Sequence, residues 1–213
     1  MSTAIFTKYS EIAKAQLKLT LWVNFLLALA LALGTPVLFG IQYLDSRASS
    51  FVLERFLTFT GIILCTPLFL PEQDNAVKEL IESKYTSFTS VLLIRLMLAL
   101  TVLLCLVSSF IGVMLLNHCQ FAAGPFILGT FATALFLGSL GFLAYSLSDN
   151  LVAGYMLPTV YYILNMFSGQ KLGNFYLFSL SMESMNEKYW LLGGALVLFA
   201  VGTAYRAMVR QLR

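Results

Sequence analysis

Six long runs of apolar residues, separated by short polar stretches, set the pattern of this 213-residue chain. A helix needs about 20 mainly apolar residues to cross the hydrocarbon core of a bilayer. The pattern therefore predicts an all-α integral membrane protein, with one transmembrane domain over residues 1–213. We expect the six transmembrane helices at Thr20–Ile41, Arg55–Leu70, Leu92–Leu116, Phe121–Leu147, Leu151–Ser168 and Trp190–Val209.

Composition agrees with this class, because 59% of the residues are hydrophobic and only 11% are charged. A soluble domain has about 25% charged residues. The net charge of +3 is small and scattered along the chain. It therefore gives no basis for nucleic-acid binding, and it fits the enrichment of cations in cytoplasmic loops.

The loops differ in their Lys and Arg content, and this difference predicts the orientation. Loops on the side of the two termini contain Lys8, Lys14, Lys18, Lys78, Lys84, Arg95, Arg206, Arg210 and Arg213. The other side has Arg47, Arg55, Lys171 and Lys188. By the positive-inside rule, both termini are predicted to lie in the cytoplasm.

Residues 1–19 have the pattern of an amphipathic helix that precedes the first span. Apolar residues recur at steps of three and four, with Lys8, Glu11, Lys14 and Lys18 on the other face. Such a helix lies flat on anionic headgroups. It is either a simple membrane anchor or an elbow helix that flanks the docking site of a partner.

A charged helix is also predicted in the cytoplasmic loop over residues 71–90. Glu72 and Asp74 suit the positive end of a helix, and Lys84 suits the negative end. Leu80 lies on an apolar stripe beside the acid Glu79. This stripe is buried either on the lipid headgroups or in a groove of a cytoplasmic partner.

The outer segment 169–189 contains the aromatic cluster Phe175–Phe178. Aromatic side chains favour the membrane interface. We expect a short interfacial or re-entrant segment here, and the alternative is a plain aromatic belt.

Signatures of catalysis and of cofactor binding are missing from the sequence. His118 is the one histidine, and the three cysteines have no CxxC spacing, so neither a multi-histidine metal site nor bis-histidine haem ligation is expected. The run Gly138–Gly141 lacks the G-x-S-x-G spacing and is interpreted, with Gly129 and Ala134, as a small-residue face for close helix packing. No phosphate-binding loop is present. The chain is predicted not to be an enzyme and to hold no cofactor.

The polar residues inside the spans are mostly neutral, among them Asn24 and Asn165. Glu54 and Arg55 are expected at the outer end of the second span, so no acid or histidine is expected at mid-membrane, where an ion-coupled transporter needs one. This predicts an external energy source. The tyrosines near Asn165 suit an amphipathic cargo, and hydrogen bonding between helices of the same chain is the alternative.

Taken together, these features resemble the permease subunit of type-2 ABC exporters. The similarity rests on the six spans with an N-terminal elbow and on two motifs. One is the loop from Glu72-Gln-Asp74 through Glu79-Leu80-Ile81 to Leu92-Leu93-Ile94-Arg95, and the other is Leu172–Ser179 before the last span. The chain is somewhat short for the family and has no large outer domain.

The resemblance implies a half-transporter in a bacterial plasma membrane. Two permease chains, identical or related, would pair through the first and fifth spans, and two separate ATPase subunits would bind ATP and Mg²⁺. Its implied cargo is an amphipathic or hydrophobic molecule, such as a bacteriocin- or lantibiotic-like peptide. Docking of the ATPase would fall to Glu72, Asp74, Glu79, Leu80 and Lys84, and the substrate path to Asn24, Phe59, Tyr162 and Asn165. The alternative function is a non-transporting scaffold or immunity protein.

Overall fold

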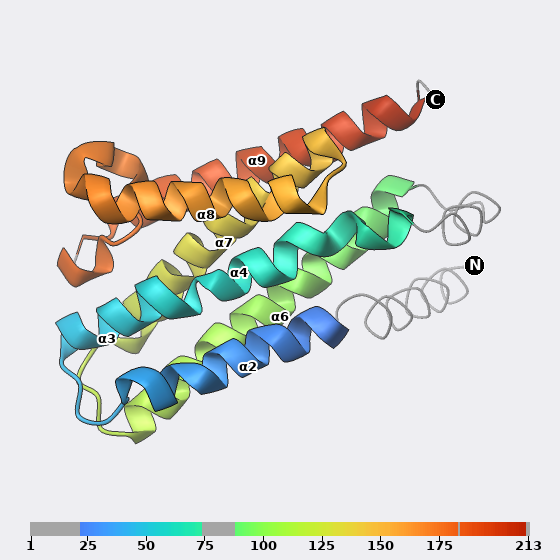
Figure 1. The fold of residues 1–213 in the computed structure, drawn as a ribbon. Coiled ribbons are helices and arrows are strands. Elements are labelled where there is room, and N and C mark those ends of the chain that lie inside the picture. Colours follow the sequence, from blue (N-terminus) through green and yellow to red (C-terminus); the bar gives the residue numbers. More distant parts are fainter. Residues whose placement is uncertain (1–21, 74–87, 183, 212–213) are drawn as a thin grey trace, which may run out of the picture.

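The computed structural model describes residues 22–73, 88–182 and 184–211, which form helices and short connections with no strand among them. Figure 1 shows these helices as one bundle. The predicted elbow helix at residues 1–19 lies outside the described residues. So does most of the predicted loop helix, because the described chain stops at Gln73 and resumes at Phe88. Both helices stay predictions.

Among the described residues, six helices are long and apolar enough to cross a membrane, which confirms the predicted all-helical class and agrees with six candidate spans. They are Trp22–Phe39, Ser46–Leu70, Thr89–Leu116, Ala123–Ser148, Leu151–Ser168 and Asn186–Val209. Three of them begin earlier than the sequence pattern predicts, the third by a few residues at Thr89 instead of Leu92. The second starts at Ser46 instead of Arg55, and the sixth starts at Asn186 instead of Trp190.

Helical elements follow one another along the chain with few interruptions. They are α2 (Trp22–Phe39), α3 (Ser46–Val52), the π-helical turn η2 (Leu53–Leu57), α4 (Phe59–Cys65), the 3₁₀ segment η3 (Thr66–Gln73), α6 (Phe88–Leu116), α7 (Ala123–Ser148), α8 (Leu151–Ser168), the 3₁₀ turns η4 (Gly169–Phe175) and η5 (Leu180–Met182), and α9 (Asn186–Gln211). The second span is therefore a composite of α3, η2, α4 and η3.

Two local distortions shape that second span. The turn η2 is π-helical, and such single wide turns interrupt the regular register of an α-helix. Further along, Pro67 departs from helical backbone angles and ends the regular helix, because proline removes a backbone donor and clashes with the preceding turn. Because of these two distortions, the polar side chains of this span point in directions that they would not have in an uninterrupted α-helix.

The two ends of the bundle differ in the segments that lie there. The N-terminal end of α2 and the C-terminal end of α9 lie at one end (Figure 1), together with the points where η3 stops and α6 starts. We call the opposite end the loop end. It carries the connections 40–45 and 117–122 and the longer segment 169–185.

Helix α7 lies at the centre of the bundle and packs against α4, α6, α8 and α9. It is apolar on all sides, as expected for a helix surrounded by protein. Two clusters of buried side chains meet around it. One contains Phe142 and Tyr145 and extends to Leu191 on α9, and the other contains Leu57 and Leu103.

Glycines on α4, α7 and α8 let these helices approach closely. A Cβ atom added to Gly61 would lie 2.0 Å from the backbone oxygen of Ala134. One added to Gly138 would lie 2.7 Å from the Gly61 oxygen, and one added to Gly141 would lie 2.9 Å from the Gly154 oxygen. The predicted small-residue face of the fourth span is confirmed. Without a hydrophobic effect between helices in lipid, such close packing is a main source of association.

The peripheral helices α2 and α8 bury only narrow stripes. On α2 the buried residues are Asn24, Ala28, Ala32 and Thr35, and on α8 they are Gly154, Pro158, Tyr162 and Asn165. Both sets follow steps of three and four residues, which place them on one helix face. The remaining faces of both helices are apolar and exposed, as is suitable for contact with lipid.

The contact between α4 and α7 gives a testable prediction. Substitution of Gly61 by Ala inserts a methyl group where the backbone of Ala134 already lies. We expect the variant to lose about 1–3 kcal/mol of stability, the usual cost of overpacking. Thermal denaturation of the purified chain in detergent, followed by gel filtration of the surviving monodisperse protein, measures this loss.

Gly112 on α6 provides the matched control, because a Cβ atom added there meets nothing within 4 Å. Gly112→Ala should leave the denaturation temperature close to that of the parent chain. Equal tolerance of both substitutions would show that α4 and α7 do not touch as described.

Candidate functional site

A buried ion pair lies between the second and the sixth span. Lys188 Nζ is 2.5 Å from Glu54 Oε1, and the two side chains are 0% and 1% exposed. Each residue belongs to a segment long and apolar enough to span the membrane. A charge in such a place is costly unless an opposite charge and hydrogen bonds compensate it.

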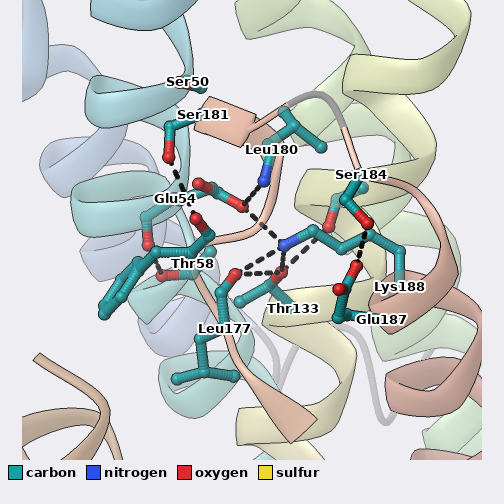
Figure 2. Close-up of polar contacts among 12 residues, drawn as sticks. Ser50, Glu54, Thr58, Thr133, Leu177, Leu180, Ser181, Ser184, Glu187 and Lys188 are labelled. Carbon is teal, nitrogen blue, oxygen red and sulfur yellow. Dashed lines mark hydrogen bonds and ion pairs between the residues drawn. The ribbon is translucent and has the colours of Figure 1, made fainter. Parts of the chain in front are cut away.

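Hydrogen bonds complete the surroundings of this pair (Figure 2). Lys188 Nζ also donates to Thr133 Oγ1 on α7 at 2.8 Å and to the Leu177 carbonyl at 2.5 Å. The Leu180 amide donates to Glu54 Oε1 at 2.9 Å. Three oxygen acceptors thus surround the ammonium, which matches its three N–H donors. We call Glu54, Thr133, Leu177, Leu180 and Lys188 the polar cluster.

The local structure explains how these groups meet. Glu54 lies in the π-helical turn η2, and Lys188 lies in the first turn of α9. Thr133 is ten residues into α7, so at a helical rise of 1.5 Å per residue the cluster lies about 15 Å from the start of that helix. The segment that contributes Leu177 and Leu180 therefore folds back from the loop end into the bundle.

Asn165 provides a second anchor for this segment. Its Oδ1 accepts a hydrogen bond of 2.9 Å from the Leu177 amide, and its Nδ2 donates to the Tyr161 carbonyl at 3.2 Å. Leu177, Phe178 and Leu180 are buried. Whether the segment is re-entrant with respect to a membrane stays a prediction, but its insertion between the helices is a feature of the structure.

Aromatic side chains surround the neighbouring part of α8. The Tyr162 hydroxyl donates to the Arg55 carbonyl at 3.0 Å, and the Tyr162 ring lies 4.6 Å from Phe59 and 5.4 Å from Phe178. Outside the spans, burial raises the pKa of the Tyr176 hydroxyl, the Glu54 carboxylate adds to the rise, and the Arg55 guanidinium partly offsets it. Tyr176 is therefore a protonated donor at neutral pH.

The structure brings together three of the four residues predicted for a substrate path. Tyr162 and Asn165 share the inward face of α8, and Phe59 contacts Tyr162. Asn24 is near the start of α2, at the other end of the bundle. The hydrogen bonds described for Tyr162 and Asn165 go to atoms of the same chain, so their role in a path stays a prediction.

The structure does not describe the side chains of the residues predicted to dock the ATPase. Asp74, Glu79, Leu80 and Lys84 lie outside the described residues, and the side chain of Glu72 is not described either.

Sequence reasoning missed the partnership of Glu54 with Lys188. It placed Glu54 at the outer end of the second span and Lys188 in the polar stretch before the sixth. The structure extends both helices toward the loop end, so both charges lie inside candidate spans. The sequence does show an acid, Glu54, and a base, Lys188, each next to an apolar run. They are 134 residues apart, however, and nothing in this spacing identifies them as partners.

Near the other end of the bundle, Arg95 is a further charged residue that lies inside a candidate span. It is fully buried in α6 and donates to the Leu68 carbonyl at 3.1 Å. Pro67 lies beside this carbonyl, where the regular helix ends. A second ion pair joins Arg206 on α9 to Asp149, and the Arg206 guanidinium lies over the Phe69 ring. This pair is more exposed than the one in the polar cluster.

Within the described part of the chain, no three His, Cys, Asp or Glu side chains are grouped so that they could hold a metal ion. His118 stacks on Tyr43 with ring centres 5.5 Å apart, and Cys119 is buried with its Sγ against the Ile41 carbonyl. Both residues help to close the connections at the loop end.

Comparison of the chain with known protein families, with curated proteins and with solved structures gives no match.

The polar cluster gives a prediction for a double-mutant cycle. Glu54→Gln or Lys188→Met alone leaves one charge buried without its counter-ion, which should cost about 3–5 kcal/mol. The double variant removes both charges, so it should be clearly more stable than the sum of the single effects predicts. Unfolding in detergent with increasing denaturant measures the free energy of unfolding of the parent chain and of the three variants.

Asp149→Asn is the control, because it removes one partner of the more exposed pair with Arg206. An exposed pair contributes about 0–1 kcal/mol, so the control should change little. Strictly additive losses at Glu54 and Lys188 would contradict the direct coupling of the two charges.

Proposed function

We propose that this chain is the membrane-spanning permease subunit of a type-2 ABC exporter. Two copies, or this chain and a related one, would pair in a bacterial plasma membrane and work with two separately encoded ATPase subunits. The cargo would be an amphipathic or hydrophobic molecule, such as a bacteriocin- or lantibiotic-like peptide. On this proposal the chain itself holds no cofactor, and ATP and Mg²⁺ bind to the partner.

One observation carries the proposal. The charged segment that resembles the family's loop connects η3 to α6 at the bundle end where α2 starts and α9 ends. In the sequence, the predicted elbow comes directly before α2, whose described start lies at this end. An ATPase that docks there could therefore reach both elements at once, as the resemblance requires. The exposed apolar faces of α2 and α8 leave the first and fifth spans available to a second permease chain.

The predicted substrate path needs a movement, because its residues are engaged within the chain. Asn165 and Tyr162 hold the segment 176–180 and the second span through hydrogen bonds. We propose that ATP-driven rocking of the spans would shift this segment and uncover the inward face of α8. The apolar and neutral polar character of that face suits an amphipathic cargo.

The polar cluster favours a second candidate, ion-coupled transport, because buried charges mark proton and ion pathways in many transporters. Against it, Lys188 already has a carboxylate and two further acceptors in one closed arrangement. Transport into inverted membrane vesicles separates the two candidates. The exporter requires ATP, whereas an ion-coupled carrier works with an imposed proton gradient alone.

The first functional prediction concerns the partner. A tagged chain extracted from its native membrane in mild detergent should retain a separate ATPase, and ATP turnover should be present in this complex but absent from the chain alone. A chain that retains no ATPase and moves no cargo, with immunity unaffected by ATP depletion, would instead support the non-transporting scaffold or immunity protein.

The second functional prediction concerns the loop. Leu80→Asp places a charge in the apolar stripe, and Glu79→Lys reverses a flanking charge, so both should uncouple ATP hydrolysis from transport while the chain stays folded. Arg47→Glu is the control, since it reverses an exposed charge on α3 at the loop end of the bundle and leaves the predicted loop helix unchanged. If both loop variants keep full transport and assembly, the stripe lies on the membrane and not on an ATPase.

A further inference from the structure

The guanidinium of Arg55 lies close to two aromatic rings. Its guanidinium carbon lies 4.4 Å from the centre of the Phe51 ring and 5.4 Å from that of Phe178. Arg55 is half-buried and Phe51 is 42% exposed, so the place where the guanidinium meets these rings is partly open to the outside. Cation–π contacts of this kind orient the plane of an arginine and leave its N–H edge free to bind.

No oxygen of a described residue uses the N–H groups of this guanidinium. The adjacent carboxylate of Glu54 is taken by Lys188 and by the Leu180 amide. The ion pairs formed within the described residues are those of Lys188 and Arg206. Arg55 therefore presents a fixed positive charge and five donors that fit a planar carboxylate or a phosphate.

The sequence places this charge at a boundary in the second span. Residues Ser46–Arg55 contain several polar side chains, whereas Phe56–Leu70 is almost wholly apolar. The guanidinium lies over Phe51, one turn nearer to the loop end than Arg55 itself. A long cationic side chain at such a boundary reaches toward the headgroup layer. Phosphate is the oxyanion that this layer supplies in quantity.

We propose that Arg55, held by Phe51 and Phe178, binds the phosphate of a membrane phospholipid at the loop end of the bundle. The half-buried Tyr176, whose ring centre lies 5.9 Å from that of Phe178, offers a second donor to the same site. A bound phosphate supplies the counter-charge that Glu54 cannot give. The lipid would then stabilise the segment 176–180 against the second span from the outside, while the polar cluster holds it from the inside.

This site does not depend on the proposed transport function. A non-transporting membrane protein with the same fold would bind the lipid equally well. Failure of the lipid experiment would leave the ABC assignment untouched, and absence of an ATPase would leave the lipid site untouched.

Native mass spectrometry of the delipidated full-length chain tests the proposal. Phosphatidylglycerol is added in detergent, and the bound fraction is compared with that of diacylglycerol with the same acyl chains, which lacks the phosphate. The parent chain should retain phosphatidylglycerol in preference to diacylglycerol. Arg55→Gln should lower phosphatidylglycerol binding about tenfold, as expected for loss of a charge-assisted hydrogen-bonded pair, without changing diacylglycerol binding.

Arg47→Gln is the matched control, because Arg47 is an exposed arginine at the same end and loses the same charge. It should bind phosphatidylglycerol like the parent chain. Arg55→Lys keeps the charge but loses the planar fork, so it should restore binding only in part. Equal binding by the parent chain and Arg55→Gln, or an equal loss in Arg47→Gln, would overturn the proposal.

Two further arms make the outcome decisive. Millimolar inorganic phosphate should not displace the lipid, and displacement would mean that free phosphate is the ligand and would overturn the assignment to a lipid. If Arg55→Gln does not yield monodisperse protein, Phe51→Leu decides, since it keeps Arg55 but removes an exposed ring. Undiminished lipid binding in Phe51→Leu would then contradict the site.

Discussion

A carboxylate and an ammonium buried inside a membrane protein have to neutralise each other, and this requirement governs the loop end of the bundle. Glu54 and Lys188 meet at 2.5 Å, far along the chain from one another. Because each charge would be very costly alone, the pair ties the second span to the sixth. Their remaining hydrogen-bonding capacity is used by Thr133 and by the backbone of the segment 176–180. The pair thus also determines where that segment lies.

Close packing of the helices makes this arrangement possible. Gly61 and Gly138 let α4 and α7 approach closely, and Gly141 does the same for α7 and α8, so Thr133 reaches the same place as Glu54 and Lys188. Helix α7 could not occupy the centre of the bundle with larger residues at these positions. Asn165 on α8 anchors the segment 176–180. For the charge of Arg55 in this region, we look for a counter-ion outside the chain, in the lipid. Packing, buried charge and the proposed lipid contact then act on the same short segment.

Much of the fold could be predicted from the sequence, because apolar runs about 20 residues long have few other uses than crossing a membrane. The six spans and the small-residue face of α7 follow from patterns within single segments. The polar cluster does not, since it depends on a π-helical turn at Leu53–Leu57, an early start of α9 and a partnership across the whole chain. Asn165 was recognised as a group that needs polar company, but its acceptor role toward the Leu177 amide depends on a loop conformation that no periodicity encodes. The predicted docking residues, by contrast, are inferred from a resemblance that the described residues do not test.

Hydrogen exchange tests most directly whether the segment 176–180 is held inside the bundle. The Leu177 amide donates to Asn165 and the Leu180 amide donates to Glu54, and both residues are buried. In the intact chain these two amides should exchange about as slowly as those of α7, because they open only when the polar cluster opens. Site-resolved exchange of the detergent-solubilised protein measures this directly, with the exposed Asn174 as an internal reference. Exchange of Leu177 and Leu180 at the rate of Asn174 would contradict the account.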